Sequence, residues 1–226
     1  INDTLYRSKN SMKSMDESLN EAKNRCANGE LYTGDICQRD LALNMPKLRQ
    51  KDSNLIVIPS CYVIMFVNPK SGLRQGKTLL DLDISHFRIR TRPDIQISMF
   101  NINNEDDRNA GIIYLKILQL TRRIIVEQIH VWSAGGDGTF MWSIDEICAA
   151  GVEIDDPRLH FSLIPFGTGN DLSQVLGWGR TISSTYMTSK MFLGFKKIID
   201  NRVAGKKARL DIWEVHIKAR DNGYIR

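Results

Sequence analysis

The chain has 226 residues, of which 42% are hydrophobic and 25% are charged, and this composition excludes a disordered or fibrous protein and is typical of a globular one. Its net charge of +5 comes from scattered lysines and arginines rather than from a basic stripe interleaved with aromatic residues, so the sequence does not indicate nucleic-acid binding. There is no run of about 18 apolar residues, which a membrane-spanning helix needs, and the first residues lack the basic, apolar and small-residue order of a secretion signal.

The cysteines and histidines show no spacing typical of metal ligands. No Cys-x-x-Cys pair occurs, so the sequence predicts no zinc site and fits a reducing, cytoplasmic environment. The histidines stand in or beside apolar runs, and we expect them to be core or surface residues. The cysteines are Cys26, Cys37, Cys61 and Cys148, and the histidines are His86, His130, His160 and His216.

Composition divides the chain into three parts. Residues 1–54 are rich in Asn, Ser, Lys and Asp and predict a flexible or peripheral lead-in, with at most a short helix near residues 12–25. Dense apolar runs begin at residue 55, and one folded domain is expected over residues 55–215. Residues 209–226 have the pattern of a strand with no following partner. We therefore interpret residues 216–226 as the start of a truncated second domain and both ends as fragment boundaries.

Runs of β-branched and aromatic residues, bounded by Pro, Gly or Asn, predict strands at residues 55–58, 62–67, 95–100, 128–134 and 160–164. Helical patterns are expected at residues 76–82 and 110–126. A third is expected after residue 139, and a fourth after residue 171 that ends at about residue 176. The polar insert Asn101–Asn109 predicts a surface loop. The repeated order of apolar strand, loop and helix predicts an α/β fold with a mainly parallel sheet flanked by helices. Ligands of such folds bind beyond the carboxyl ends of the strands.

The segment Gly135-Gly-Asp-Gly-Thr139 follows a buried strand and has three glycines in four positions. Glycine permits positive φ angles and close approach, so main-chain N–H groups at the start of the next helix can bind a phosphate. A bare phosphate would repel Asp137, which therefore indicates Mg²⁺ or the proton of an attacking hydroxyl nearby. The alternative is a tight turn in which Asp137 only caps a helix.

Two further loops repeat this arrangement at the ends of other strands. Gly167-Thr-Gly-Asn-Asp171 offers the Thr168 hydroxyl as a donor, with Asn170 or Asp171 as the helix cap. Asn68-Pro-Lys-Ser-Gly72 follows the strand at residues 62–67. A parallel sheet needs only one or two glycines in each turn, so three such loops together indicate a shared phosphate-binding site.

A P-loop is the competing interpretation of the segment that begins in the loop at residues 68–72. The segment Ser71-Gly-Leu-Arg-Gln-Gly76-Lys77-Thr78 departs from the Walker A pattern only in having Ser71 in place of the first glycine. That glycine is needed for the tight geometry of the loop, and a P-loop enzyme has no need of the other two glycine-rich turns. We therefore favour the three-loop site.

The motifs together resemble the catalytic region of diacylglycerol kinases, over about residues 60–215. Related kinases of sphingosine, ceramide and NAD share the first two motifs, whereas the third motif and the Trp-Gly that follows it are similar to the diacylglycerol enzymes in particular. Leu210-Asp-Ile-Trp-Glu214 resembles the passage of that family into its second domain. The motifs are Phe66–Gly72, Gly135–Thr139, Ile164–Leu172 and Leu176–Gly179.

The resemblance implies a nucleotide-binding domain like those of NAD kinase and phosphofructokinase, joined to a β-sandwich domain, with ATP in the cleft between them. It implies phosphorylation of diacylglycerol to phosphatidic acid by a cytoplasmic enzyme that associates peripherally with a membrane surface. Asp137 is expected to be catalytic and to act around Mg²⁺ and the γ-phosphate. The residues expected to bind ATP are Asn68, Pro69, Lys70, Ser71, Gly72, Gly135, Gly136, Asp137, Gly138, Thr139, Gly167, Thr168, Gly169 and Asn170.

Two departures from the family pattern affect the expected activity. The family usually has Ala-Arg where this chain has Ser173-Gln174, so the phosphate contact expected of that arginine is in question. The β-sandwich domain, which the resemblance implies as the source of a general base and of further metal ligands, is not expected in this chain. The alternatives are a kinase of sphingosine, ceramide or NAD, and a non-catalytic nucleotide-binding module. Two basic clusters, Lys196-Lys197 and residues 206–209, are either solvated helix ends or contacts with an anionic membrane.

Overall fold

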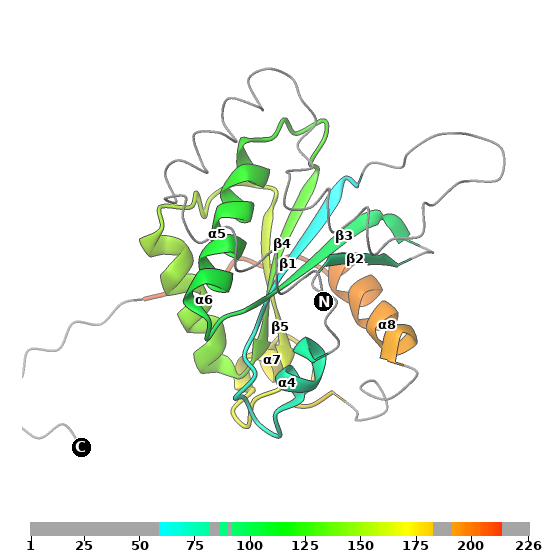
Figure 1. Cartoon of the computed structure of the whole chain (residues 1–226), viewed down its shortest axis with the longest axis vertical. Coiled ribbons are helices and arrows are strands. Elements are labelled where there is room, and N and C mark those ends of the chain that lie inside the picture. Colours follow the sequence, from blue (N-terminus) through cyan, green and yellow to red (C-terminus); the bar gives the residue numbers. More distant parts are fainter. Residues whose placement is uncertain (1–58, 82–85, 90–91, 183–190, 214–226) are drawn as a thin grey trace, which may run out of the picture.

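The structure is a computed structural model that describes residues 59–81, 86–89, 92–182 and 191–213 (Figure 1). Its centre is a five-stranded sheet with the strand order β2-β3-β1-β4-β5. Strands β3, β1, β4 and β5 are parallel, and β2 pairs antiparallel with β3 at one edge. The predicted mainly parallel α/β fold is therefore confirmed. Among the described residues, no helix combines the length and the apolar character that crossing a membrane requires.

Strands and helices alternate along most of the chain. The strands are β1 (Cys61–Val67), β2 (His86–Ile89), β3 (Arg92–Asn101), β4 (Gln128–Gly135) and β5 (Leu159–Pro165). The helices are α4 (Gln75–Leu80), α5 (Glu105–Leu120), α6 (Asp137–Ala149), α7 (Asp171–Val175) and α8 (Met191–Val203). The predicted strand at residues 55–58 and the predicted helix near residues 12–25 lie outside the described residues. Sequence patterns missed β2 and α8.

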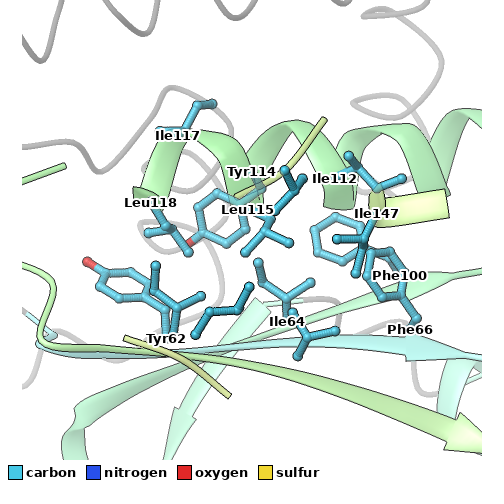
Figure 2. Packing of buried hydrophobic residues seen from close by; sticks show 14 of the residues in the cluster. Tyr62, Ile64, Phe66, Phe100, Ile112, Tyr114, Leu115, Ile117, Leu118 and Ile147 are labelled. Atoms are coloured by element: carbon cyan, nitrogen blue, oxygen red, sulfur yellow. The ribbon is translucent and has the colours of Figure 1, made fainter. Parts of the chain in front are cut away.

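Both faces of the central strand β1 are buried, as its unbroken apolar sequence predicts. Tyr62, Ile64 and Phe66 point toward α5, where they meet Tyr114 and Leu115 in one apolar cluster (Figure 2). The alternate residues of β1 belong to a second cluster on the opposite face, which includes Leu79 of α4 and Ile199 of α8. Helices thus cover both faces, and the loops at the strand ends are left to form a site.

The prediction of a surface loop over Asn101–Asn109 was wrong, because α5 already begins at Glu105. The Asn104 side chain caps this helix by accepting the N–H of Asp107 at 3.0 Å. The Asp107 carboxylate accepts the N–H of Asn101 at 2.6 Å. Acidic side chains in a first turn are stabilised by the helix dipole, so the polar composition marked a helix start rather than a loop.

Helix α5 ends at Leu120, six residues before the predicted end. Arg158, which immediately precedes β5, donates from its guanidinium to the carbonyl oxygens of Gln119 and Thr121 at 2.7 and 2.9 Å. Its charge is balanced by Asp156 at 2.7 Å, and both side chains are buried. This pair satisfies carbonyl groups that a helix end leaves without partners.

The described histidines are core or surface residues, as expected. The rings of His130 and His160, which are direct partners on β4 and β5, lie 5.2 Å apart between centroids. Burial lowers the pKa of His130 to about 3, and it also lowers the pKa of His160. Burial raises the pKa of the Cys61 thiol to about 12, while Cys148 is exposed. Cys26, Cys37 and His216 lie outside the described residues.

Candidate nucleotide-phosphate site

The three predicted loops meet at one edge of the sheet. In chain order, the first loop is residues 68–72, the second is residues 135–139 and the third is residues 167–171. Strands β1, β4 and β5 are parallel and adjacent, so their carboxyl ends lie together. Main-chain hydrogen bonds join the loops: Asn68 donates its N–H to Ala134 at 2.9 Å, and Phe166 donates to Gly135 at 3.0 Å. Asp137 donates its N–H to the carbonyl oxygen of Gly169 at 3.0 Å. The loops therefore form one connected structure.

Some of the glycines are required because the loops touch each other. A Cβ atom at Gly72 would overlap the carbonyl oxygen of Phe166, and Gly72 also has a φ of +50°. A Cβ at Gly167 would lie 2.6 Å from the main-chain nitrogen of Gly136. These positions have no room for a side chain, so the glycine motifs encode contact between loops as well as contact with a ligand.

Two other glycines face open space. A Cβ built at Gly138 or at Gly169 would meet no atom within 4 Å. Gly138 is an exposed residue in the first turn of α6, a helix of 13 residues whose main-chain N–H groups and dipole favour an anion. The open side of the loops is therefore where a phosphate group can approach the main chain.

Asn68 and Thr139 link the first two loops through their side chains. The Asn68 amide donates to the Thr139 hydroxyl at 2.9 Å, and the Ser71 hydroxyl lies 3.4 Å from the same oxygen. Asn103, which follows β3, donates from its side-chain amide to the side-chain oxygen Oδ1 of Asn68 at 3.1 Å. Sequence reasoning missed Asn103, although its place after a fourth parallel strand was a usable signal. Pro69 and Lys70 complete this loop, and Lys70 is exposed.

Asp137 joins the second and third loops. One carboxylate oxygen, Oδ2, accepts the main-chain N–H groups of Asp171 at 2.8 Å and of Leu172 at 3.4 Å, so it caps α7 rather than its own helix. The other oxygen, Oδ1, is buried and has no hydrogen-bond partner. Among the described residues, no group of three or more His, Cys, Asp or Glu side chains could hold a metal ion. Asp137 is thus a single carboxylate with one free acceptor.

Asn170 supports the third loop from within. Its side chain is 2% exposed and donates from Nδ2 to the carbonyl oxygens of Gly167 at 2.5 Å and of Arg180 at 2.7 Å. Its own carbonyl oxygen, Oδ1, is buried without a partner and lies 3.7 Å from the position that a Cβ of Gly136 would take. Thr168, in contrast, is exposed on the loop. Asp137 Oδ1 and Asn170 Oδ1 are therefore two buried acceptor oxygens of the joined loops that have no partner within the protein.

The turn after α7 is fastened to α8, which sequence reasoning did not foresee. Gly177 and Gly179 have φ angles of +80° and +82°, and the Trp178 ring between them lies 3.8 Å from the guanidinium carbon of Arg202. Arg202 also donates to the carbonyl oxygen of Leu163 on β5 at 3.1 Å. Burial lowers the pKa of the Arg202 guanidinium to about 10. The stacked pair thus holds the turn at residues 177–179, which follows α7, against α8.

The Ser173-Gln174 departure has a structural counterpart. Ser173 is fully buried and donates its hydroxyl to the carbonyl oxygen of Gly179 at 2.9 Å, so it stabilises the same turn. Gln174 is exposed.

The geometry gives no support to the P-loop alternative. Gly76 is not a loop residue but a buried residue of α4 that packs against the main-chain carbonyl oxygen of Asn68.

Comparison with known proteins identifies relatives. The family described as "Diacylglycerol kinase catalytic domain" matches residues 62–200. The chain is 27% identical to human diacylglycerol kinase iota over 159 residues, which is 69% of this chain and 12% of that protein. It is 29% identical over 171 residues to diacylglycerol kinase 4 of Arabidopsis thaliana, which is 73% of this chain and 33% of the relative. The chain thus spans between about an eighth and a third of these curated relatives.

Proposed function

The chain belongs to the diacylglycerol kinase catalytic domain family, and we propose that it binds ATP at the three joined loops and transfers the γ-phosphoryl group to the hydroxyl of diacylglycerol. The product is phosphatidic acid. The observation that carries the proposal is the junction of three loops at one sheet edge, with the first turn of α6 open beside them. The similarity to proteins named as diacylglycerol kinases, such as human diacylglycerol kinase iota, supports the choice of acceptor.

The phosphate groups of ATP are bound mainly by the main chain. Gly138 and Gly169 leave open space, so a triphosphate can approach the peptide N–H groups without meeting a side chain. The exposed hydroxyl of Thr168 adds a donor at the third loop. The hydrogen bonds of Asn68 and Thr139 fix the geometry of the first two loops before ATP arrives, which reduces the cost of organising the site.

Magnesium fits the chemistry of the unpartnered acceptor oxygens of the joined loops. Mg²⁺ prefers oxygen ligands and keeps several waters, so Asp137 Oδ1 and Asn170 Oδ1, which have no partner within the protein, are the oxygen atoms that would be available to it. A bound Mg²⁺ would neutralise charge on the phosphate oxygens. This role also explains why a carboxylate is tolerated next to a phosphate-binding turn.

The reaction is an in-line displacement. The acceptor hydroxyl oxygen forms a bond to the γ-phosphorus, the bond from that phosphorus to the bridging oxygen of ADP breaks, and the hydroxyl proton is released. Most of the rate enhancement in such transfers comes from positioning and from charge neutralisation. Both effects depend on the joined loops keeping their relative positions.

The test is a single added charge at the open turn. Gly138→Asp has room for its side chain and places a carboxylate where a phosphate approaches, so we expect ATP affinity to fall at least about a hundredfold, near 2.7 kcal/mol. Gly136→Asp would be a poorer test, because its Cβ would lie 2.8 Å from the Gly169 carbonyl oxygen and would disturb the loops. Gly138→Ala, which adds no charge, should weaken binding far less.

Asn201→Asp supplies the matched control. It adds the same single charge at an exposed position of α8, and it should leave ATP affinity unchanged in calorimetry. Equal ATP affinity of Gly138→Asp and the unsubstituted chain would remove the proposed site. Radiolabelled ATP offered with diacylglycerol, sphingosine, ceramide or NAD then identifies the acceptor. ATP binding without any labelled product would favour a non-catalytic nucleotide-binding module.

A further inference from the structure

A large apolar side chain projects from the first loop at the carboxyl edge of the sheet. Leu73 is 92% exposed, although the next glycine on its amino side, Gly72, packs tightly against Phe166 of the third loop. A leucine held this far into solvent by a fixed loop contributes nothing to the core. Leu73 is therefore free to contact a partner outside the folded chain.

The third loop presents apolar residues at the same edge. Val175 is 83% exposed and Leu176 is 39% exposed, both at the end of α7. Helices α4 and α7 lie at the same end of the molecule, below the carboxyl ends of the strands (Figure 1). We call Leu73, Arg74, Lys77, Val175 and Leu176 the basic-apolar edge.

Charge at this edge is positive. Arg74 and Lys77 are exposed, and within the described residues neither has an ion-pair partner. Among the described residues, the acidic side chains of these two helices are Asp81, at the end of α4, and Asp171, which starts α7 and pairs with Arg180 at 2.7 Å. Exposed apolar side chains flanked by unpaired cations are the chemistry that an anionic lipid surface binds.

We propose that the basic-apolar edge docks on an anionic lipid surface and inserts Leu73, Val175 and Leu176 among the headgroups. This inference rests on the proposed function, because an acceptor held in a bilayer can meet a γ-phosphate only if the edge that carries the phosphate loops faces that bilayer. The phosphate loops and the basic-apolar edge belong to the same connected loops. Docking and phosphoryl transfer therefore require one orientation of the protein.

The basic cluster at residues 206–209 does not share this orientation. These residues follow α8, whose Asp200 forms an ion pair at 3.1 Å with Arg92, the first residue of β3 at the amino ends of the strands. A membrane contact there would turn the phosphate loops away from the lipid. The cluster is better explained as a solvated segment.

The chain contains a matched control at the amino end of the sheet. Ile124 is 86% exposed and follows Arg122 and Arg123 in the connection that leads into β4, so it has the same chemistry at the opposite end. The experiment is sedimentation of the whole chain with vesicles of phosphatidylcholine containing about one third phosphatidylserine. It compares the unsubstituted chain with Leu73→Ser/Val175→Ser, Lys77→Ser and Ile124→Ser.

We expect the unsubstituted chain to bind these vesicles and to bind pure phosphatidylcholine vesicles more weakly. The double variant should lose at least about tenfold in vesicle affinity and Lys77→Ser about fivefold, whereas Ile124→Ser should be unchanged. Unchanged melting temperatures would show that these exposed substitutions leave the fold intact. No binding by the unsubstituted chain, or a loss with Ile124→Ser and none with the double variant, would overturn the inference.

ATP calorimetry on the same proteins separates this inference from the proposed function. Leu73, Val175 and Lys77 are outside the proposed ATP contacts, so ATP affinity should be the same in all variants. If vesicle binding fails while ATP binding persists, only the docking surface is wrong. If the unsubstituted chain binds no ATP, the proposed function fails first.

Discussion

The contact between Gly136 and Gly167 predicts a specific cost for the smallest possible side chain. A Cβ at Gly167 would overlap the Gly136 Cα and lie 2.6 Å from the Gly136 nitrogen, so the two loops must part by about 1 Å to restore an ordinary contact of 3.4 Å. Overpacking of this kind costs about 1–3 kcal/mol of unfolding free energy. We expect Gly167→Ala to be destabilised by that amount, measured by urea denaturation. Because the phosphate-binding N–H groups move with the loops, its ATP affinity should fall at least about tenfold, or 1.4 kcal/mol.

Gly169→Ala is the matched control for stability. Gly169 lies two residues away in the same loop, an added Cβ meets no atom within 4 Å, and its φ is outside the left-handed range. Alanine at such a position restricts the unfolded chain and should leave stability unchanged or raise it by about 0.4–1 kcal/mol. If Gly167→Ala and Gly169→Ala unfold at the same urea concentration, the loop contact does not constrain the site and the reasoning is refuted.

Three further predictions follow from other contacts. Asp137→Asn keeps an oxygen that can cap α7, so its free energy of unfolding should change by less than about 1 kcal/mol, while the rate of lipid phosphorylation should fall at least about a hundredfold. A rate within tenfold of that of the unsubstituted enzyme would show that Asp137 serves only as a helix cap. The pKa of His130 is about 3 in the folded state and about 6.5 in the unfolded state, so the unfolded state binds an extra proton as the pH falls. The free energy of unfolding should therefore drop by about 2 kcal/mol between pH 6.5 and pH 5, and His130→Gln should lack this part of the pH dependence when stability is measured along an acid titration. Arg158→Met leaves the buried Asp156 carboxylate without its partner and should cost about 3–5 kcal/mol by thermal or urea unfolding, with Asp156→Asn/Arg158→Met recovering part of the loss; a cost below 1 kcal/mol for the single variant would contradict this account.

The sequence predicted the sheet and the three loops because their signals are local. A buried parallel strand needs an unbroken apolar run, and a loop that touches another main chain needs glycine, so both requirements can be read at single positions. Gly135, Gly136 and Gly167 were therefore found, together with the strands that end in them. The parallel arrangement then placed the loops at one edge without any knowledge of side-chain contacts.

Contacts between distant residues could not be predicted in this way. Asp137 was expected to cap its own helix or to act on a ligand, whereas its Oδ2 caps α7, 34 residues further along the chain. The stacking of Trp178 with Arg202 depends on how α8 crosses the sheet, and no local pattern reports that. The start of α5 at Glu105 was misjudged for a different reason: polar residues favour a loop and a helix N-terminus alike, and only the cap geometry separates the two.

The glycines of this site have two separate physical roles that a motif cannot distinguish. Gly72, Gly136 and Gly167 are glycine because another main chain occupies the space of their side chains, whereas Gly138 has empty space around it. Substitution of the first kind acts on stability and on ATP affinity together, since it separates the loops. Substitution at Gly138 acts on the ligand alone, since nothing in the protein has to move. The ratio of the two effects at each position therefore measures how much of the motif serves the fold and how much serves the phosphate.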